Sequence, residues 1–358
     1  AIAELPDIKL TVFTCVKSEP DRKWEVQNKF PFATRCLSGF SFNLPGHNVY
    51  IKPELIRIPK REKFDVVVCG SFEVFSMTLA FISAYYHGVP FVLWSEIIKE
   101  SRTLFGKYLR KLIIGKSTSF FASGKLATEY LINMGADADK IFIGGDVVDN
   151  DFFSANSRMT MAEKTSMKDS FGISQSKIVL FCGQFIKRKR PVDLLVAFSI
   201  VKQQFKDAAL VFLGYGPMEN LIRKESAACN ISDSVYIIPF QKYEDLPRYY
   251  TFADMLVIPS DYEPWGLVIN EAMACGLPVV AADAVGAAAD LVHEGVNGNV
   301  VPTGNIQALA GSILKLLSDK DLLQKMGNAS RDIIKKWNFK NSADSFAEAC
   351  KAAKRKLL

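Results

Sequence analysis

Two carboxylates stand eight residues apart in the sequence Ser260-Asp-Tyr-Glu263-Pro-Trp-Gly266-Leu-Val-Ile-Asn-Glu271. The apolar run 255–259 before it predicts a buried strand, and the segment 267–274 inside it predicts a helix. A strand, a short loop and a helix in this order are typical of a parallel α/β sheet. Ligands of such sheets bind outside the carboxyl ends of the strands, so we expect this loop to carry chemistry.

The same alternation extends in both directions along the chain. In the second half we expect strands at 177–182, 209–213, 235–239, 255–259 and 278–281, and helices at 192–205, 218–229, 246–252 and 267–274. In the first half we expect strands at 8–13, 65–69, 91–94, 119–122 and 140–143, and helices ending near 86, at 97–114 and at 125–134. Short connections between these elements predict parallel sheets that are covered by helices.

A polar stretch, 154–176, interrupts this rhythm and is typical of an interdomain linker. We therefore predict two Rossmann-like, doubly wound domains that face each other across a cleft, at 1–160 and 170–339. A last helix within 340–358 is expected to cross back onto the first domain. Because residues 1–13 resemble the end of a helix followed by a strand, we also expect a preceding βα unit to be missing; the alternative is a domain that starts with a short helix.

Composition excludes several classes of protein. The chain has 358 residues, of which 49% are hydrophobic and 23% charged, which excludes disorder as the main state. No apolar run reaches the roughly 18 residues that span a bilayer. The seven cysteines are scattered without a CxxC pair; this predicts a reducing, cytoplasmic location and neither a disulfide framework nor a zinc site. The net charge of +6 favours anionic partners.

Helix geometry gives the two carboxylates separate roles. With a rise of 1.5 Å per residue, Glu263 and Glu271 should lie about 10 Å apart, roughly the distance from a hexose to the ribose of a nucleotide sugar. The helix N-terminus at Gly266-Leu267-Val268 lies between them and suits a diphosphate. A retaining glycosidase needs its carboxyls about 5 Å apart, so this spacing argues against such an acid/base pair.

The segment resembles the Glu-x7-Glu motif of the family-4 retaining glycosyltransferases, which have the GT-B fold. The resemblance continues through Glu271-Ala-Met-Ala-Cys-Gly276-Leu-Pro278 and reaches Asp290-Leu291 and Gly295-Val-Asn297-Gly298. In the first half, residues 141–152 resemble another segment of the same family, with Asp149 and Phe152 in the matching positions. The resemblance covers most of 60–340 and is looser in the first domain.

The resemblance implies roles for single residues. Glu263 would bind hydroxyls of the transferred hexose, and Glu271 the ribose hydroxyls. Backbone N–H groups of Trp265, Gly266, Leu267 and Val268 would face the sugar and diphosphate. In the basic loop after the strand 177–182, Lys189 matches a family lysine, Gly183 matches a glycine, and Gln184 stands where the family often has arginine. Arg188 or Arg190 would then supply the missing charge.

The basic loop also has a physical interpretation of its own. Four consecutive cations, 187–190, repel one another unless an anion neutralises them, and they would stabilise a departing diphosphate. The alternative is a solvated basic loop. Gly214 and Gly216 follow the next strand; the resemblance implies that this turn approaches the nucleotide and that its glycines permit close backbone contact. We expect Glu263, Lys189 and Arg188 to be the catalytic residues.

Acceptor-side candidates lie in the first domain. Glu96 follows a strand, and it would contact either the sugar or the acceptor; the alternative is a helix N-terminus with Ser95 as its cap. His47 lies in a loop that would reach an acceptor. The basic amphipathic segment 97–116 is a candidate for peripheral contact with the anionic inner face of a membrane; the alternative is a helix that packs on its own sheet.

These features predict a hexosyltransferase that moves a hexose from a nucleoside-diphosphate sugar to a hydroxyl acceptor on a glycan, lipid or small molecule, with retention of configuration. No metal, no cofactor and no nucleic acid are expected. Two alternatives stay open: a nucleotide-sugar epimerase of the same two-domain plan, and a non-catalytic module that binds sugar nucleotides.

Overall fold

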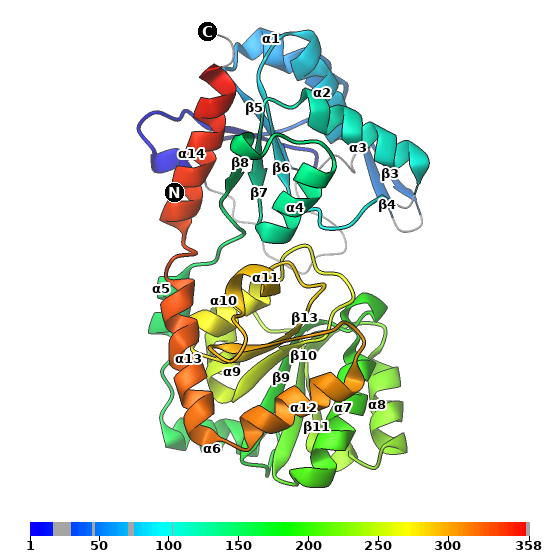
Figure 1. Cartoon of the computed structure of the whole chain (residues 1–358), viewed down its shortest axis with the longest axis vertical. Coiled ribbons are helices and arrows are strands. Elements are labelled where there is room, and N and C mark those ends of the chain that lie inside the picture. The colour runs from blue at the N-terminus through cyan, green and yellow to red at the C-terminus, as the bar shows by residue number, and fades with distance from the viewer. Residues whose placement is uncertain (17–29, 45–46, 71–74, 102, 356–358) are drawn as a thin grey trace. The chain divides into compact units, whose positions relative to one another are not determined.

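The computed structural model describes residues 1–16, 30–44, 47–70, 75–101 and 103–355 (Figure 1). The chain divides into two compact units: 1–145 with 339–358, and 146–338. The boundary therefore lies earlier than the expected 160–170. The last helix, α14 (Phe339–Arg355), belongs to the first unit.

The second unit is built on a six-stranded parallel sheet with the order β11-β10-β9-β12-β13-β14. Its strands are β9 (Lys177–Gln184), β10 (Ala208–Tyr215), β11 (Val235–Ile238), β12 (Met255–Ile258), β13 (Val279–Ala282) and β14 (Gly298–Val301). The chain starts in the middle at β9, moves outward to β11, and then returns to β12 on the other side of β9. The strand order thus reverses between β9 and β12, where doubly wound sheets bind ligands.

Helices cover both faces of this sheet (Figure 1). They are α5 (Asn150–Ala155), α6 (Met161–Ser170), α7 (Pro191–Gln204), α8 (Glu219–Ala228), α9 (Leu246–Phe252), α10 (Leu267–Ala274), α11 (Ala288–Leu291), α12 (Ile306–Leu317) and α13 (Lys320–Ile334). Successive strand residues point to opposite faces: Leu180 packs with Ile269 of α10, whereas Phe181 packs with Phe198 of α7. The unit therefore has a core on each side of its sheet.

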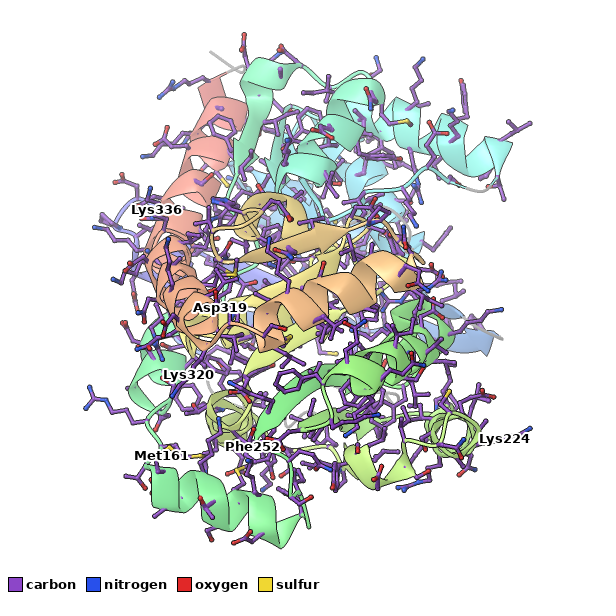
Figure 2. All side chains as sticks on the ribbon, turned by 60° about the horizontal axis from the view of Figure 1, so that its bottom comes forward. Met161, Lys224, Phe252, Asp319, Lys320 and Lys336 are labelled. Atoms are coloured by element: carbon purple, nitrogen blue, oxygen red, sulfur yellow. The ribbon has the colours of Figure 1, made fainter. Side chains whose placement is uncertain are left out.

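The expected linker 154–176 is wrong. This stretch contains the end of α5 and all of α6, and α6 begins with a capping box in which Thr160 and Glu163 exchange hydrogen bonds. Phe153 of α5 is buried in the core of the second unit. The helix α6 lies at the surface (Figure 2), where Met161 is 79% exposed, whereas Phe252 of α9 is fully buried.

The first unit has a four-stranded parallel sheet with the order β5-β6-β7-β8. Its elements are β5 (Val67–Gly70), β6 (Phe91–Ser95), β7 (Ser119–Ala122), β8 (Ile141–Ile143), α1 (Ile58–Glu62), α2 (Phe75–Tyr86), α3 (Leu104–Lys116) and α4 (Lys125–Asn133). Leu93 packs with residues of α2, α3 and α4 on one face. Val92 and Phe121 pack with Phe346 of α14 on the other. Two layers of helices therefore enclose this sheet as well.

Two small sheets complete the first unit. β1 (Thr11–Thr14) pairs in parallel with β2 (Ala33–Cys36), and β3 (Phe40–Leu44) forms an antiparallel hairpin with β4 (His47–Ile51). Short 3₁₀ turns lie at Ile2–Glu4, Pro53–Ile56, Ala138–Lys140, Lys187–Lys189, Ser232–Ser234 and Tyr243–Asp245.

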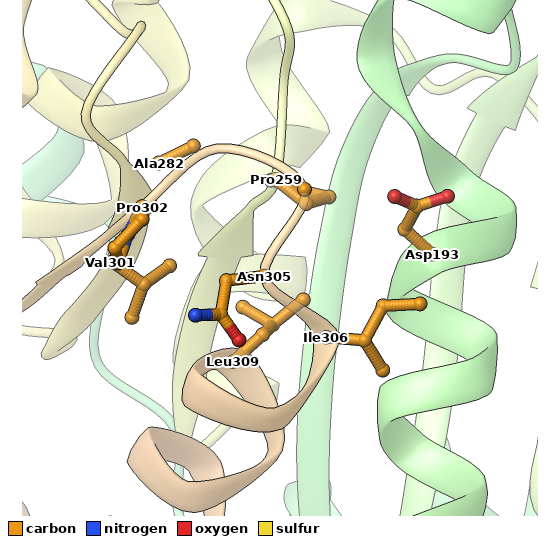
Figure 3. Close-up of a pocket in the computed structure, with 9 residues that line it drawn as sticks. Asp193, Pro259, Ala282, Val301, Pro302, Asn305, Ile306 and Leu309 are labelled. Carbon is orange, nitrogen blue, oxygen red and sulfur yellow. The ribbon is translucent and has the colours of Figure 1, made fainter.

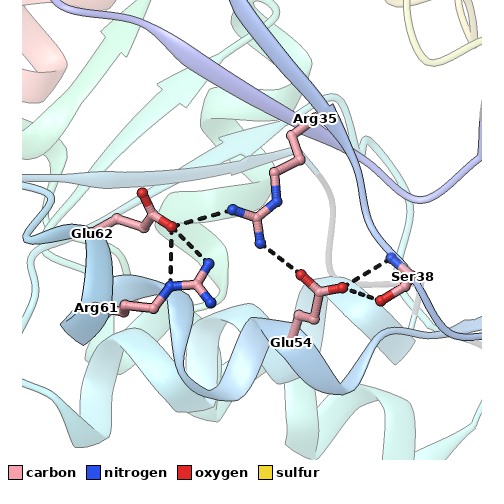
Figure 4. Close-up of polar contacts among 5 residues, drawn as sticks. All are labelled: Arg35, Ser38, Glu54, Arg61 and Glu62. Atoms are coloured by element: carbon pink, nitrogen blue, oxygen red, sulfur yellow. Dashed lines mark hydrogen bonds and ion pairs between the residues drawn. The ribbon is translucent and has the colours of Figure 1, made fainter.

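An ion-pair cluster ties β2 to the turns that follow the hairpin (Figure 4). Arg35 contacts Glu54 at 2.6 Å and Glu62 at 3.2 Å. Hydrogen bonds from Ser38 and then from Arg35 lower the pKa of Glu54 to about 2. Both carboxylates therefore stay ionised and keep their contacts with Arg35 down to acidic pH.

The helix expected at 97–114 begins later. Leu104 starts α3, and Thr103 caps it by accepting a hydrogen bond from the N–H of Gly106 at 3.1 Å. No helix begins at 97 to 99 in the described chain, so Ser95 and Glu96 do not form the alternative helix N-terminus; Ser95 Oγ instead accepts a hydrogen bond from the N–H of Ile97.

Candidate functional site

The two loops that carry the predicted site residues leave the sheet at its switch point. β9 and β12 are neighbours in the sheet, with Leu180 opposite Leu256. The loop after β9 brings Lys189, and the loop after β12 brings Glu263. Their side chains meet at 2.9 Å, and each is only 13% exposed. The structure thus joins two expected catalytic residues that are 74 positions apart in the sequence.

Carboxylates of the chain itself partly neutralise the basic loop. Arg188 lies 3.3 Å from Glu263 and donates to the backbone carbonyl of Tyr262. Arg190 contacts Asp193 at 2.7 Å and also pairs with Asp261. The repulsion among these cations is therefore relieved without a bound anion. Because Arg190 is engaged with two carboxylates, its contacts hold the two loops together, whereas Lys189 and Arg188 share one carboxylate.

The loop after β12 enters α10 through a glycine. Gly266 has φ +107°, which favours glycine, and a Cβ there would lie 3.3 Å from Glu263 and from Val285. The backbone of Glu263 is fixed by hydrogen bonds with Ala284 and Gly286. Trp265 is buried, and its indole N–H donates to Asn270 at 2.9 Å. The start of α10 is thus held rigidly beside Glu263, and the first N–H groups of a helix have no partners within it.

Glu271 occupies the second turn of α10 and is 8% exposed. Burial raises the pKa of its carboxyl to about 7, against the opposing effects of a hydrogen bond from Tyr250 and the charge of Lys189. Tyr250 donates its hydroxyl to Oε2 of Glu271 at 2.5 Å. Sequence analysis did not find Tyr250, because a tyrosine in an apolar helix gives no sign of a polar partner 21 residues later.

Glycines at the ends of β9 and β10 allow two backbones to approach each other: Gly183 and Gly214 are paired near the carboxyl ends of these strands, and Gly216 follows β10. A Cβ on Gly214 would lie 2.0 Å from the carbonyl oxygen of Gly183, and one on Gly216 would lie 2.5 Å from that of Phe185. Gly183 in turn lies under the Lys189 side chain, whose Nζ would be 3.3 Å from a Cβ there. These positions therefore have a packing requirement that is independent of any nucleotide.

Two hollows lie near this edge of the sheet. One, of about 340 Å³, is lined by Gln184, Ile186, Tyr215, Gly216 and Pro217. Gln184 donates to the hydroxyl of Tyr215 there at 3.2 Å. The other, which includes Asp193 and Pro259, has a volume of about 10 Å³ (Figure 3). The second is water-sized, whereas the first is within the range of small-molecule sites.

The acceptor-side candidates belong to the other unit. Glu96 is exposed directly after β6. His47 begins β4, and its side chain is outside the described part of the structure.

The described ranges contain no group of three or more His, Cys, Asp or Glu side chains that could hold a metal ion. None of their helices has the length and apolar character needed to cross a bilayer. All seven cysteines fall within the described residues and are free thiols.

Comparison with known proteins finds a family match within the second unit. Residues 163–333 match the family described as Glycosyl transferases group 1. The chain is 29% identical to the alpha-D-kanosaminyltransferase of Streptomyces kanamyceticus over 52% of its length and 49% of that protein. It is 26% identical to a GDP-mannose-dependent alpha-(1-6)-phosphatidylinositol monomannoside mannosyltransferase of Mycobacterium tuberculosis, over 67% of its length and 63% of that protein. The chain thus covers about half to three fifths of these curated relatives.

Solved structures confirm the predicted fold. The crystal structure of HepE from Anabaena in complex with UDP is similar with a TM-score of 0.74 and 18% identity, covering 89% of this chain and 86% of that one. The chain therefore has the GT-B fold, with two Rossmann-like parallel sheets.

Proposed function

We propose that this protein is a retaining, metal-independent hexosyltransferase that uses a nucleoside-diphosphate sugar. The observation that carries the proposal is the Lys189–Glu263 contact at the switch point of the sheet, directly before the N-terminus of α10. The proposal is supported by the match of 163–333 to glycosyltransferases of group 1.

The charges of the site suit a diphosphate. Lys189 and Arg188 share a single carboxylate, Glu263, so this group of three side chains carries a net positive charge. A donor diphosphate at the start of α10 would attract both cations and the helix dipole. Glu263 would then accept hydrogen bonds from hexose hydroxyls, and Glu271, eight residues further, from the ribose.

In the proposed reaction, the bond from C1 of the hexose to the diphosphate oxygen breaks, and the electron pair leaves with the diphosphate. Lys189, Arg188 and the N-terminus of α10 stabilise this negative charge. The acceptor hydroxyl bonds to C1 on the face that the diphosphate leaves, and its proton passes to the departing diphosphate. The configuration at C1 is thereby retained, and no protein nucleophile is needed.

The relatives suggest which donors to test first. HepE has been crystallised with UDP-glucose, and the relative from Mycobacterium tuberculosis is described as GDP-mannose-dependent. Both donors should be incubated with the full-length protein, with and without glycan and lipid-linked acceptors. Transfer of label to an acceptor with retained configuration supports the proposal. An epimerised donor formed without an acceptor would favour the epimerase instead, and binding without turnover the non-catalytic module.

Glu263→Gln tests the central residue. Loss of a charged group that acts on the reacting sugar typically lowers kcat by about 100-fold or more. Glu225→Gln on α8 is a matched control and should keep full activity. EDTA should leave the rate of the unmodified protein unchanged, because Lys189 and Arg188 supply the positive charge. Transfer by Glu263→Gln at the unmodified rate would remove Glu263 from the mechanism.

The first unit carries a surface suited to an anionic membrane, which we propose as the acceptor side. On α3, Leu104, Phe105, Tyr108 and Leu112 are 89%, 76%, 70% and 43% exposed. Lysines flank this apolar stripe, with Lys107 and Lys111 on one side and Lys116 on the other. An exposed apolar face with flanking lysines is typical of helices that lie in a membrane interface. We accordingly propose a cytoplasmic protein that acts at the inner face.

The structure changes which residues should be tested. Arg110, one of the basic residues of the segment 97–116, is buried and donates to the carbonyl oxygen of Lys99 and the hydroxyl of Tyr130. The membrane variant should therefore be Lys107→Glu with Lys111→Glu, and the control Lys315→Glu with Lys325→Glu in the second unit. The first pair should reduce flotation with anionic vesicles at low salt, and the control pair should not. Equal flotation of both variants would exclude α3 as the contact.

A further inference from the structure

A buried tyrosine contacts the carboxylate that we place at the donor ribose. Tyr250 of α9 is fully buried, and its hydroxyl donates to Oε2 of Glu271 at 2.5 Å. The same hydroxyl lies 3.4 Å from Sγ of Cys182 on β9. Three elements of the second unit thus meet around one carboxylate, behind the start of α10.

The groups around Glu271 differ in the hydrogen bonds and charges with which they can stabilise its carboxylate. Burial raises the pKa of the Cys182 thiol to about 12, so this group stays neutral. The pKa of the Tyr250 hydroxyl is raised as well, which keeps it a hydrogen-bond donor at physiological pH. Lys189 contributes a favourable charge, and Cys275 and Tyr243 are the other titratable groups that interact with Glu271. The hydrogen bond from Tyr250 favours the ionised carboxylate.

We propose that Tyr250 is a positioning residue, which holds the Glu271 carboxylate in the orientation and ionised form that accept the two ribose hydroxyls of the donor. This inference rests on the role given to Glu271 in the proposed function. An ionised carboxylate has about four acceptor sites. Tyr250 occupies one of them on Oε2, which leaves capacity for both ribose hydroxyls.

The test compares a ribose nucleotide with one that lacks the hydroxyls. Dissociation constants of UDP and 2′,3′-dideoxy-UDP, and of GDP and its dideoxy form, should be measured by calorimetry for the full chain. The unmodified protein should prefer the ribose form. Tyr250→Phe should weaken binding of that form about tenfold, the typical effect of losing a hydrogen bond to a charged group, and leave the dideoxy form unchanged. Its affinity for the ribose form should also require a higher pH, because the carboxylate ionises less readily.

Tyr249→Phe, the neighbouring position on α9, is the matched control and should keep the ribose preference. If Tyr250→Phe weakened both nucleotides equally, Tyr250 would only support the fold and the inference would be wrong. Should that variant fail to fold, Tyr250→His, whose ring nitrogens end short of Oε2 of Glu271, takes its place; it should lose the ribose preference, and a retained preference would overturn the inference.

Glu271→Gln separates this inference from the proposed function. If Glu271→Gln keeps the ribose preference, the placement of the donor along α10 is wrong. If Glu271→Gln loses the preference while Tyr250→Phe keeps it, the donor placement stands and only the role of Tyr250 is excluded.

Discussion

Burial of Glu271 opposes the ionised state that ribose binding requires. The pKa of this carboxyl is about 7 in the folded protein, against an ordinary value of 4.5. The folded state therefore binds more protons than the unfolded state between these pH values, so stability falls as pH rises through this window. The difference corresponds to a loss on the order of 3 kcal/mol. Placing this carboxylate away from water therefore lowers the stability of the folded protein above pH 7.

We expect Glu271→Gln to be more stable than the unmodified protein above pH 7, and to lose this advantage as pH falls towards 4.5. Thermal unfolding at pH 5 and pH 8 measures the effect. Glu225→Gln, which alters a partly exposed carboxyl of α8, should show no comparable difference between the two pH values. A destabilised Glu271→Gln variant at pH 8 would mean that the hydrogen bond from Tyr250 outweighs the cost of burying the charge.

At the scale of single residues, the sequence predicted which loops carry the site better than it predicted which side chains pair with one another. Glu263 and Lys189 stood out because each follows a strand, and the structure brings them together. Asp261 was not recognised as the partner of Arg190, because 71 residues separate them and only the adjacency of β9 and β12 makes them neighbours. Pairing between loops depends on strand order, which the local sequence does not contain.

Among the elements, buried strands were the easiest to predict. A strand of a parallel sheet is buried on both faces, so it consists of a nearly continuous run of apolar and β-branched residues, as in β9 and β12. The hairpin β3–β4 and the edge strand β14 were missed, although the alternation of apolar and polar residues in Phe40–Leu44 is typical of a half-buried strand. The helix α6 was missed because its polar composition resembles a linker, although Thr160-x-x-Glu163 is a capping-box sequence.

The carboxyl end of β10 offers a sharp test of element geometry, because Gly214 pairs there with Gly183 of β9. Gly214 has φ +147°, and its Cβ would lie 2.0 Å from the carbonyl oxygen of Gly183, whereas nothing lies within 4 Å of a Cβ on Gly311 in α12. Gly214→Ala should therefore destabilise the protein by more than about 1 kcal/mol. Gly311→Ala should stabilise it by about 0.5–1 kcal/mol, because alanine is the better helix former. Urea unfolding measures both changes. An unchanged free energy of unfolding for Gly214→Ala would show that the ends of β9 and β10 are free to separate.

At the scale of the whole molecule, each hydrophobic core lies within one unit. The clusters around Leu180 and Phe181 belong to the second unit, and those around Leu93 and Phe121 belong to the first. The first unit also depends on the end of the chain: Ser119 donates to the carbonyl oxygen of Ala349 at 2.7 Å, and Phe346 packs on Phe121. We therefore expect two unfolding transitions that respond to different changes.

Phe346→Ala should lower the free energy of unfolding of the first unit alone, by about 3–5 kcal/mol, the usual cost of removing a buried phenylalanine. A bound nucleotide should raise the free energy of unfolding of the second unit alone, by about 2.7 kcal/mol at a concentration of 100 times Kd. Calorimetry of the full chain, with and without UDP or GDP, distinguishes the two transitions. If the nucleotide and Phe346→Ala moved the same transition, the donor site would not be confined to 146–338, and the separation of the cores would not govern how the molecule unfolds.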